Sequence, residues 1–147
     1  MEIARFYEKG YTAHTGILQF LYHEGDGHRI LMDYISCDIS TIVGGQAASF
    51  AAVLLSAGTP GKRLAFQNAQ IMVHKISASF FGKEPDIEIQ AENIRQLNDN
   101  LVSILAKNCS KSVREMERAM DRDNFMTAEE AKSFGLIDGI ITTNKRY

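Results

Sequence analysis

The chain has 147 residues, of which 45% are hydrophobic and 23% are charged, and its formal net charge is −2. This length and composition predict one domain with a substantial core, and the small net charge favours neither nucleic acid nor an anionic membrane as a partner. No hydrophobic run approaches the length of a membrane span. The two cysteines have no disulfide or zinc-site spacing, and residues 1–10 contain no apolar signal segment, so we expect a cytoplasmic protein.

The secondary-structure pattern is weak before residue 30 and clear from residue 39 onward. Residues 30–35 could end an amphipathic helix. Further along, runs of apolar residues alternate with helical periodicity, which predicts an α/β fold. We expect strands at 39–43, 63–66, 71–75 and 136–142, and helices at 47–57, 86–107, 112–121 and 127–135.

Local signals mark several of these boundaries. Ser112 with Glu115, and Thr127 with Glu130, form the capping-box pattern at two predicted helix starts. Gly58 is a natural residue to follow the helix at 47–57. The helix at 86–107 has an apolar stripe of Ile94, Leu97, Leu101, Ile104 and Leu105.

Ser49 is the first residue with catalytic potential. It lies near the start of the predicted helix 47–57, after a strand and the Gly44-Gly45 pair. Backbone N–H groups and the positive end of the helix dipole favour an oxyanion there, and the N–H of Phe50 is the natural first donor. A serine at a helix start is more often an N-cap, so this signal is weak alone.

His74 and Asp123 supply the other groups that a nucleophilic hydrolase needs. His74 ends an apolar strand and could take the serine proton, and Asp123 could orient the imidazole. Each also has a structural interpretation: a half-buried histidine bonded to the backbone, and a surface salt bridge or helix cap. The three residues together modestly favour a Ser-His-Asp triad.

Eight short segments form a more specific pattern. They are 38–42 (DISTI), 45–49 (GQAAS), 54–58 (LLSAG), 61–63 (GKR), 72–74 (MVH), 86–89 (DIEI), 121–131 (DRDNFMTAEEA) and 135–138 (GLID). In this order they resemble the proteolytic subunit of the ATP-dependent Clp protease, over residues 31–142. The resemblance implies a single domain over residues 1–147, with residues 1–30 divergent from the family.

The fold implied by the resemblance is the Clp/crotonase fold, an α/β spiral of ββα units with a protruding handle helix at 86–107. The implied catalytic residues are Ser49 as nucleophile, His74 as general base and acid, and Asp123 as the orienting carboxylate. The Phe50 N–H takes the oxyanion-hole position. Arg122 resembles the residue that forms a ring-to-ring ion pair in the family.

The activity implied by the resemblance is that of a serine endopeptidase that degrades unfolded polypeptides to peptides. Family members form two stacked heptameric rings and receive substrates from a hexameric Clp ATPase. ATP is used by that partner, so we expect no cofactor and no metal in this subunit. The histidines and carboxylates of residues 23–28 lack helical zinc-motif spacing and are separated by glycines, which do not preform a metal site.

Two features depart from the family. Residues 15–27 contain no Ser-Pro-Gly-Gly loop, whose glycine supplies the second oxyanion donor in the family, and losing one such donor costs about 3 kcal/mol. Lys75-Ile76 replaces a Gln-Pro pair in a segment that binds the substrate backbone, and the N–H of Ile76 could still pair there. The first departure keeps open a weakened or non-catalytic subunit of a mixed ring. A crotonase-type acyl-CoA enzyme is a further, weaker alternative.

Overall fold

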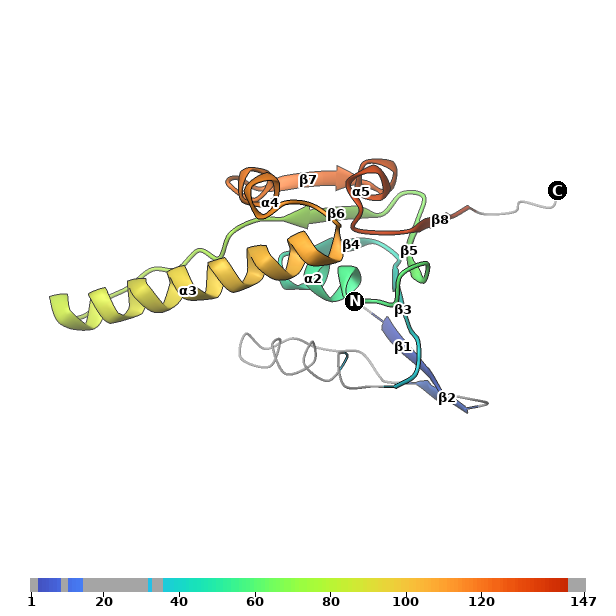
Figure 1. Cartoon of the computed structure of the whole chain (residues 1–147), viewed down its shortest axis with the longest axis horizontal. Helices are drawn as coiled ribbons and strands as arrows, with labels where there is room; N and C mark the ends of the chain where they lie inside the picture. Colours follow the sequence, from blue (N-terminus) through green and yellow to red (C-terminus); the bar gives the residue numbers. More distant parts are fainter. Residues whose placement is uncertain (1–2, 9–10, 15–31, 33–35, 143–147) are drawn as a thin grey trace.

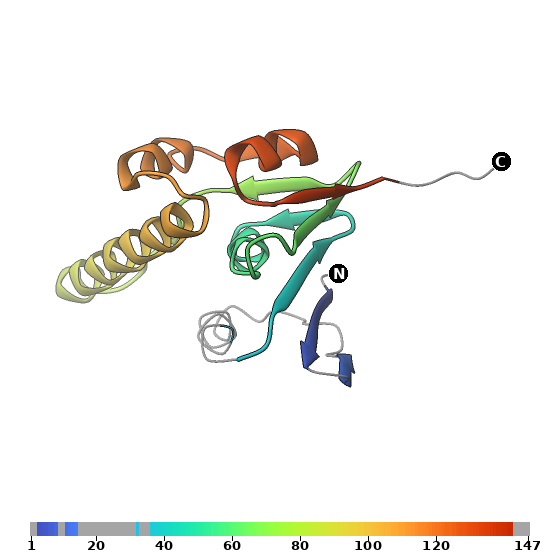
Figure 2. The same cartoon turned by 45° about the vertical axis from the view of Figure 1, so that its right-hand side comes forward.

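Two β-sheets and four helices make up the part of the chain described by the structure, a computed structural model that describes residues 3–8, 11–14, 32 and 36–142 (Figures 1 and 2). The larger sheet has five strands in the order β2-β1-β3-β5-β8, and the smaller has three in the order β4-β6-β7. The strands are β1 (Ile3–Glu8), β2 (Tyr11–His14), β3 (Ile39–Val43), β4 (Gln46–Ala48), β5 (Arg63–Phe66), β6 (Gln70–Val73), β7 (Asn124–Thr127) and β8 (Gly139–Ile141).

The order of the strands follows a repeating ββα unit. Strands β3 and β4 are followed by α2 (Phe50–Ser56), and β5 and β6 are followed by α3 (Glu84–Asn108). In each unit the first strand joins the larger sheet and the second joins the smaller. The pairs β3–β5 and β4–β6 are both parallel. The predicted α/β spiral of ββα units is therefore confirmed.

Helix α3 extends away from the rest of the molecule, with its N-terminal end farthest out (Figures 1 and 2). Its buried residues are Val102, Leu105 and Ala106, all near its C-terminal end. The upstream part of its predicted apolar stripe, including Ile94 and Leu97, is only half-buried. The long protruding helix expected from the resemblance is present.

The main hydrophobic core contains residues of both sheets and of all four helices. Strand β6 contributes Ile71 and Val73, and α3 contributes Val102 and Leu105. Two shorter helices, α4 (Val113–Ala119) and α5 (Ala128–Phe134), complete the described elements. Both begin with the capping boxes expected from the sequence, because Ser112 and Thr127 each bond reciprocally with the residue three positions later.

The side chain of Arg63, on β5, connects the ends of three helices. Its Nε and Nη2 donate to the carboxylate of Asp138 at 2.9 and 2.5 Å. Its Nη1 donates to three backbone carbonyls, those of Ser56, Asn108 and Gly135, at 3.4, 2.8 and 3.0 Å. Ser56 and Asn108 are the last residues of α2 and α3, and Gly135 caps α5. One buried cation thus satisfies the C-terminal carbonyls of three helices, where positive charge is favoured.

The ion pair shifts the titration of both partners. The hydrogen bond from Arg63 lowers the pKa of Asp138 from 3.8 to about 2. The same hydrogen bond raises the pKa of Arg63, although burial opposes it. Both groups are therefore charged at neutral pH, and the charges are held in the folded state by hydrogen bonds.

Several predicted boundaries are wrong. The expected helix 47–57 begins at Phe50, because Gln46–Ala48 instead pairs with β6 as strand β4. The last predicted strand, 136–142, is reduced to Gly139–Ile141. The long helix begins at Glu84, two residues early, since proline is accepted in a first helical turn. Strands β1, β2 and β7 were not predicted.

Other expectations lie outside the described residues or stay predictions. Of residues 30–35, only Met32 is described, and the potential metal ligands at 23–28 and the segment 15–27 are not. The single domain over 1–147 stays a prediction. None of the helices in the described part of the chain has the length and hydrophobicity to cross a membrane.

Replacing Arg63 with Lys is expected to destabilise the fold by about 2–3 kcal/mol. Lysine keeps the charge, but it cannot serve Asp138 and three carbonyls together, so buried acceptors lose their donor. Urea unfolding followed by circular dichroism measures the change. Lys62→Met is the matched control, because Lys62 contacts Asp38 in an exposed pair worth about 0–1 kcal/mol. Equal losses in both variants would contradict the role given to Arg63.

The stabilisation that depends on Asp138 ionisation is expected to disappear in acid. The folded-state pKa is about 2 and the ordinary value is 3.8, so the unfolded chain binds the proton first as pH falls. The stability advantage of the native chain over Asp138→Asn should be constant above about pH 5 and shrink between about pH 4 and pH 2. Unfolding free energies of both proteins, measured across this range, test the expectation. An advantage that persists at about pH 2 would contradict it.

Candidate active site

Ser49 occupies a strained position between strand β4 and helix α2. Its backbone angles are φ 58° and ψ −123°, and such positive φ values are uncommon for residues other than glycine. The Ser49 N–H donates to the carbonyl of Met72 at 2.9 Å, which ties this turn to β6. Strain of this kind occurs where surrounding contacts determine the conformation, and it is frequent at functional sites.

The hydroxyl of Ser49 does not cap helix α2. Although Ser49 is the residue before the helix, its side chain makes no capping hydrogen bond. Instead, Ser49 Oγ lies 3.0 Å from His74 Nε2. The N-cap alternative for this serine is therefore wrong, and the exposed hydroxyl is directed at an imidazole.

The other ring nitrogen of His74 contacts Asp123. His74 Nδ1 lies 3.0 Å from Asp123 Oδ1. When Nδ1 carries the proton, its N–H donates a hydrogen bond to the carboxylate, and Nε2 accepts the hydrogen bond from the serine hydroxyl. This arrangement allows the imidazole to take the serine proton, and the carboxylate then stabilises the imidazolium.

The register of the smaller sheet brings the three side chains together. Ala48, one position before Ser49, pairs with Met72, two positions before His74. On the other side of β6, Val73 pairs with Asn124 in an antiparallel ladder. His74 directly follows Val73 and Asp123 directly precedes Asn124, so the two residues leave the sheet side by side. Ser49, His74 and Asp123 therefore lie at the same end of this sheet, where β4 and β6 end and β7 begins.

The predicted oxyanion residues are only partly described. Phe50 is the first residue of α2, directly after Ser49, as its predicted role requires. Its assignment as an oxyanion donor stays a prediction. The segment expected to supply a second donor, residues 15–27, lies outside the described residues.

The chain that follows His74 is held by two different contacts. The Lys75 N–H donates to the carbonyl of Met120 at 3.1 Å. The Ile76 N–H donates to Asn98 Oδ1 at 2.7 Å, and Asn98 Nδ2 donates to the Ile76 carbonyl at 3.5 Å. Both backbone groups of Ile76 are thus paired with a side chain on α3, which corrects the expectation that the Ile76 N–H would be open to substrate. No spacing signal connects positions 76 and 98, so Asn98 was missed.

The remaining reactive side chains in the described part of the chain do not join this group. Burial raises the pKa of Cys109 to about 11, so its thiol stays protonated at neutral pH and is a poor nucleophile. Cys109 caps the end of α3, as a structural helix-end thiol would. Among the described residues, no three His, Cys, Asp or Glu side chains gather in a way that could hold a metal ion. Arg122, beside Asp123, is exposed, and its ring-contact role stays a prediction.

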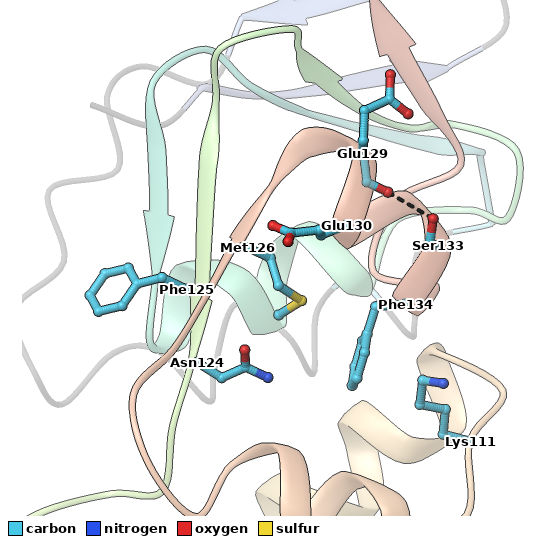
Figure 3. Close-up of a pocket in the computed structure, with 8 residues that line it drawn as sticks. All are labelled: Lys111, Asn124, Phe125, Met126, Glu129, Glu130, Ser133 and Phe134. Carbon is cyan, nitrogen blue, oxygen red and sulfur yellow. Dashed lines mark hydrogen bonds between the residues drawn. The ribbon is translucent and has the colours of Figure 1, made fainter.

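A hollow is lined by residues of β7 and α5 and by Lys111 (Figure 3). Lys111 lies above the ring of Phe134, with its Nζ 4.6 Å from the ring centroid. Phe125 points away from Met126 in Figure 3, as neighbouring strand residues do. The lining residues are Lys111, Asn124, Phe125, Met126, Glu129, Glu130, Ser133 and Phe134, and none of them is a triad member.

Contacts of this kind between a serine, a histidine and an aspartate are typical of one class of protein, the serine hydrolases. A comparison with protein families identifies the group within that class. The family described as Clp protease matches residues 29–144, which is well over half of the chain. The chain belongs to the Clp protease family.

Replacing Asp123 with Asn is expected to slow the reaction of Ser49 with a fluorophosphonate by about 10³–10⁴-fold. The amide would favour the imidazole tautomer with its proton on Nε2, which cannot accept the serine proton. Labelling rates of the purified proteins measure the effect. Asp121→Asn is the control, because this neighbouring exposed carboxylate contacts only Lys75, at 3.9 Å, among the ion pairs of the described residues. Similar rates in native and Asp123→Asn proteins would contradict the orienting role.

Proposed function

We propose that this chain is a serine endopeptidase, the proteolytic subunit of an ATP-dependent Clp protease. The observation that carries the proposal is the unbroken series of contacts from Ser49 Oγ to His74 Nε2 and from His74 Nδ1 to Asp123 Oδ1, each 3.0 Å. Family membership supports it, since the three residues fall within the matched segment 29–144. The strained backbone of Ser49 is a further supporting feature.

The mechanism follows from the geometry of the three side chains. Ser49 Oγ attacks the carbonyl carbon of a peptide bond while His74 Nε2 removes its proton. The protonated His74 then gives this proton to the leaving amine, and the C–N bond breaks to leave an ester on Ser49. Water, deprotonated by His74, attacks the ester, the bond to Ser49 Oγ breaks, and His74 returns the proton to this oxygen as the acid product leaves. Asp123 holds the imidazole in place through both half-reactions.

The assembly and partners are proposed from the family. Two stacked heptameric rings would enclose the active sites, and a hexameric Clp ATPase would deliver unfolded polypeptides with ATP that it alone consumes. Helix α3 is suited to contacts between copies, because it protrudes and Ile89 on it is 69% exposed. This subunit would need no cofactor or metal of its own, and we place it in the cytoplasm.

A weakened or non-catalytic subunit is the second candidate. The observation that favours it is the absence of a Ser-Pro-Gly-Gly sequence in residues 15–27, where the family has its second oxyanion donor. Such a subunit would occupy a place in a mixed ring beside complete subunits. The loss of one donor typically reduces the rate by about 10²–10³-fold, which separates this candidate from a fully active enzyme.

Replacing Ser49 with Ala is expected to abolish both fluorophosphonate labelling and cleavage of a fluorogenic peptide, because it removes the attacking oxygen. Circular dichroism should show the native fold in the variant. Labelling that persists in Ser49→Ala, or a native chain that is never labelled, would contradict the proposed activity.

The second candidate predicts a different pattern in the same assay. A native chain that turns over peptide slowly alone, and whose Ser49 labels faster after mixing with a complete Clp subunit, would support the mixed-ring role. For the Ser49→Ala test, the matched control is Ser56→Ala. Ser56 is buried, and its hydroxyl bonds to the Val53 carbonyl and to Asn108, so its removal should leave labelling unchanged.

A further inference from the structure

The backbone before His74 is held in a sheet, and the backbone after it is not. Before it, β6 is paired with β4 and with β7, so the backbone up to Val73 is held within the smaller sheet. After it, residues 74–80 leave the sheet and form no helix or strand. Two backbone N–H groups hold this segment, that of Lys75 on the Met120 carbonyl and that of Ile76 on Asn98 Oδ1.

Asn98 makes the side-chain contact that holds this segment. Its Oδ1 accepts the Ile76 N–H at 2.7 Å, which is a short bond for a neutral pair, and its Nδ2 reaches the Ile76 carbonyl at 3.5 Å. Both residues are half-buried, so water competes weakly for these groups. One carboxamide thus matches the donor and the acceptor of one residue.

The same contact ties the segment to the long helix. Asn98 lies on α3 one turn before Val102, which is buried in the main core. The anchor is therefore a rigid element, while Ile76 is only two residues from His74. A proline at position 76 would have no N–H for this bond, so the contact requires a residue other than proline there.

We propose that Asn98 is a positioning residue that keeps the His74 imidazole aligned with Ser49 by holding Ile76 against α3. The proposal rests on the proposed serine peptidase function. Asn98 acts through the backbone and has no contact with the reacting atoms. Because a misplacement of about 1 Å can cost roughly a hundredfold in rate, the loss of this anchor should be visible in the chemistry.

The test compares three single variants of the full chain. Asn98→Leu has a similar size and no hydrogen-bonding group. Asn98→Asp keeps the oxygen that accepts the Ile76 N–H. Asn100→Leu is the matched control, since Asn100 is an exposed residue on the same helix. The readouts are the labelling rate of Ser49 by a fluorophosphonate across the pH range of histidine titration, and the urea unfolding free energy.

We expect Asn98→Leu to label about 10–100-fold more slowly at the pH plateau, and Asn98→Asp to recover most of the native rate. With a fluorogenic peptide, kcat should fall and KM should stay within about twofold, because Asn98 does not bind substrate. Combining Asn98→Leu with Ile76→Pro should reduce the labelling rate by less than the product of the two single reductions. Both variants remove the same hydrogen bond, from the Ile76 N–H to Asn98 Oδ1. Asn100→Leu should match the native protein.

The outcomes separate this proposal from the proposed function. Native labelling rates in Asn98→Leu, or an equal loss of rate in Asn98→Leu and Asn100→Leu, would overturn the role of Asn98 and leave the peptidase proposal intact. A native chain that is not labelled would instead overturn the proposed function. In that case NMR signals of the His74 ring still decide: a shift and a changed titration in Asn98→Leu alone support the positioning role, and unchanged signals refute it.

Discussion

The ion pair between buried Arg63 and half-buried Asp138 holds the ends of three helices at one place in the structure. The desolvation of two charges is costly, and it is offset here because the guanidinium makes five side-chain hydrogen bonds. Three of these reach the C-terminal ends of α2, α3 and α5. These are the helix that begins after Ser49, the helix that carries Asn98 and the helix that follows β7. One side chain thus links the ends of three helices that adjoin the elements of the candidate site.

The contacts of Ser49, His74 and Asp123 depend on the register of the three-stranded sheet. Ser49, His74 and Asp123 each lie immediately outside a strand, where the backbone can turn the side chain out of the sheet. The neighbouring pairs are fixed by ladder hydrogen bonds, so a slip of one residue would separate the imidazole from both partners. The strained backbone of Ser49 is tolerated because the Met72 carbonyl and helix α2 hold both of its sides.

The candidate site was predictable in part. The types and order of Ser49, His74 and Asp123, with their resemblance to the Clp protease family, identified the three residues as a possible triad. Sequence reasoning alone could not decide between a capping and a reactive role for Ser49, since the two differ only in where the hydroxyl points. It also could not find Asn98, whose partner lies 22 positions away and is a backbone group. Every residue except proline has a backbone N–H, so no sequence motif indicates which one binds Asn98.

The features that could be predicted from the amino-acid sequence are those that local interactions control. The strands at 39–43 and 63–66, both capping boxes and the glycine that ends α5 depend on residues a few positions apart, and each has a recognisable signature. The tertiary structure decided strands β4 and β7, the ion pair across 75 positions and the 3.0 Å contacts of the triad. Strands β4 and β7 have no recognisable signature in the sequence and little stability of their own, so they form where a partner strand supplies their hydrogen bonds. That partner is chosen by the packing of the whole chain.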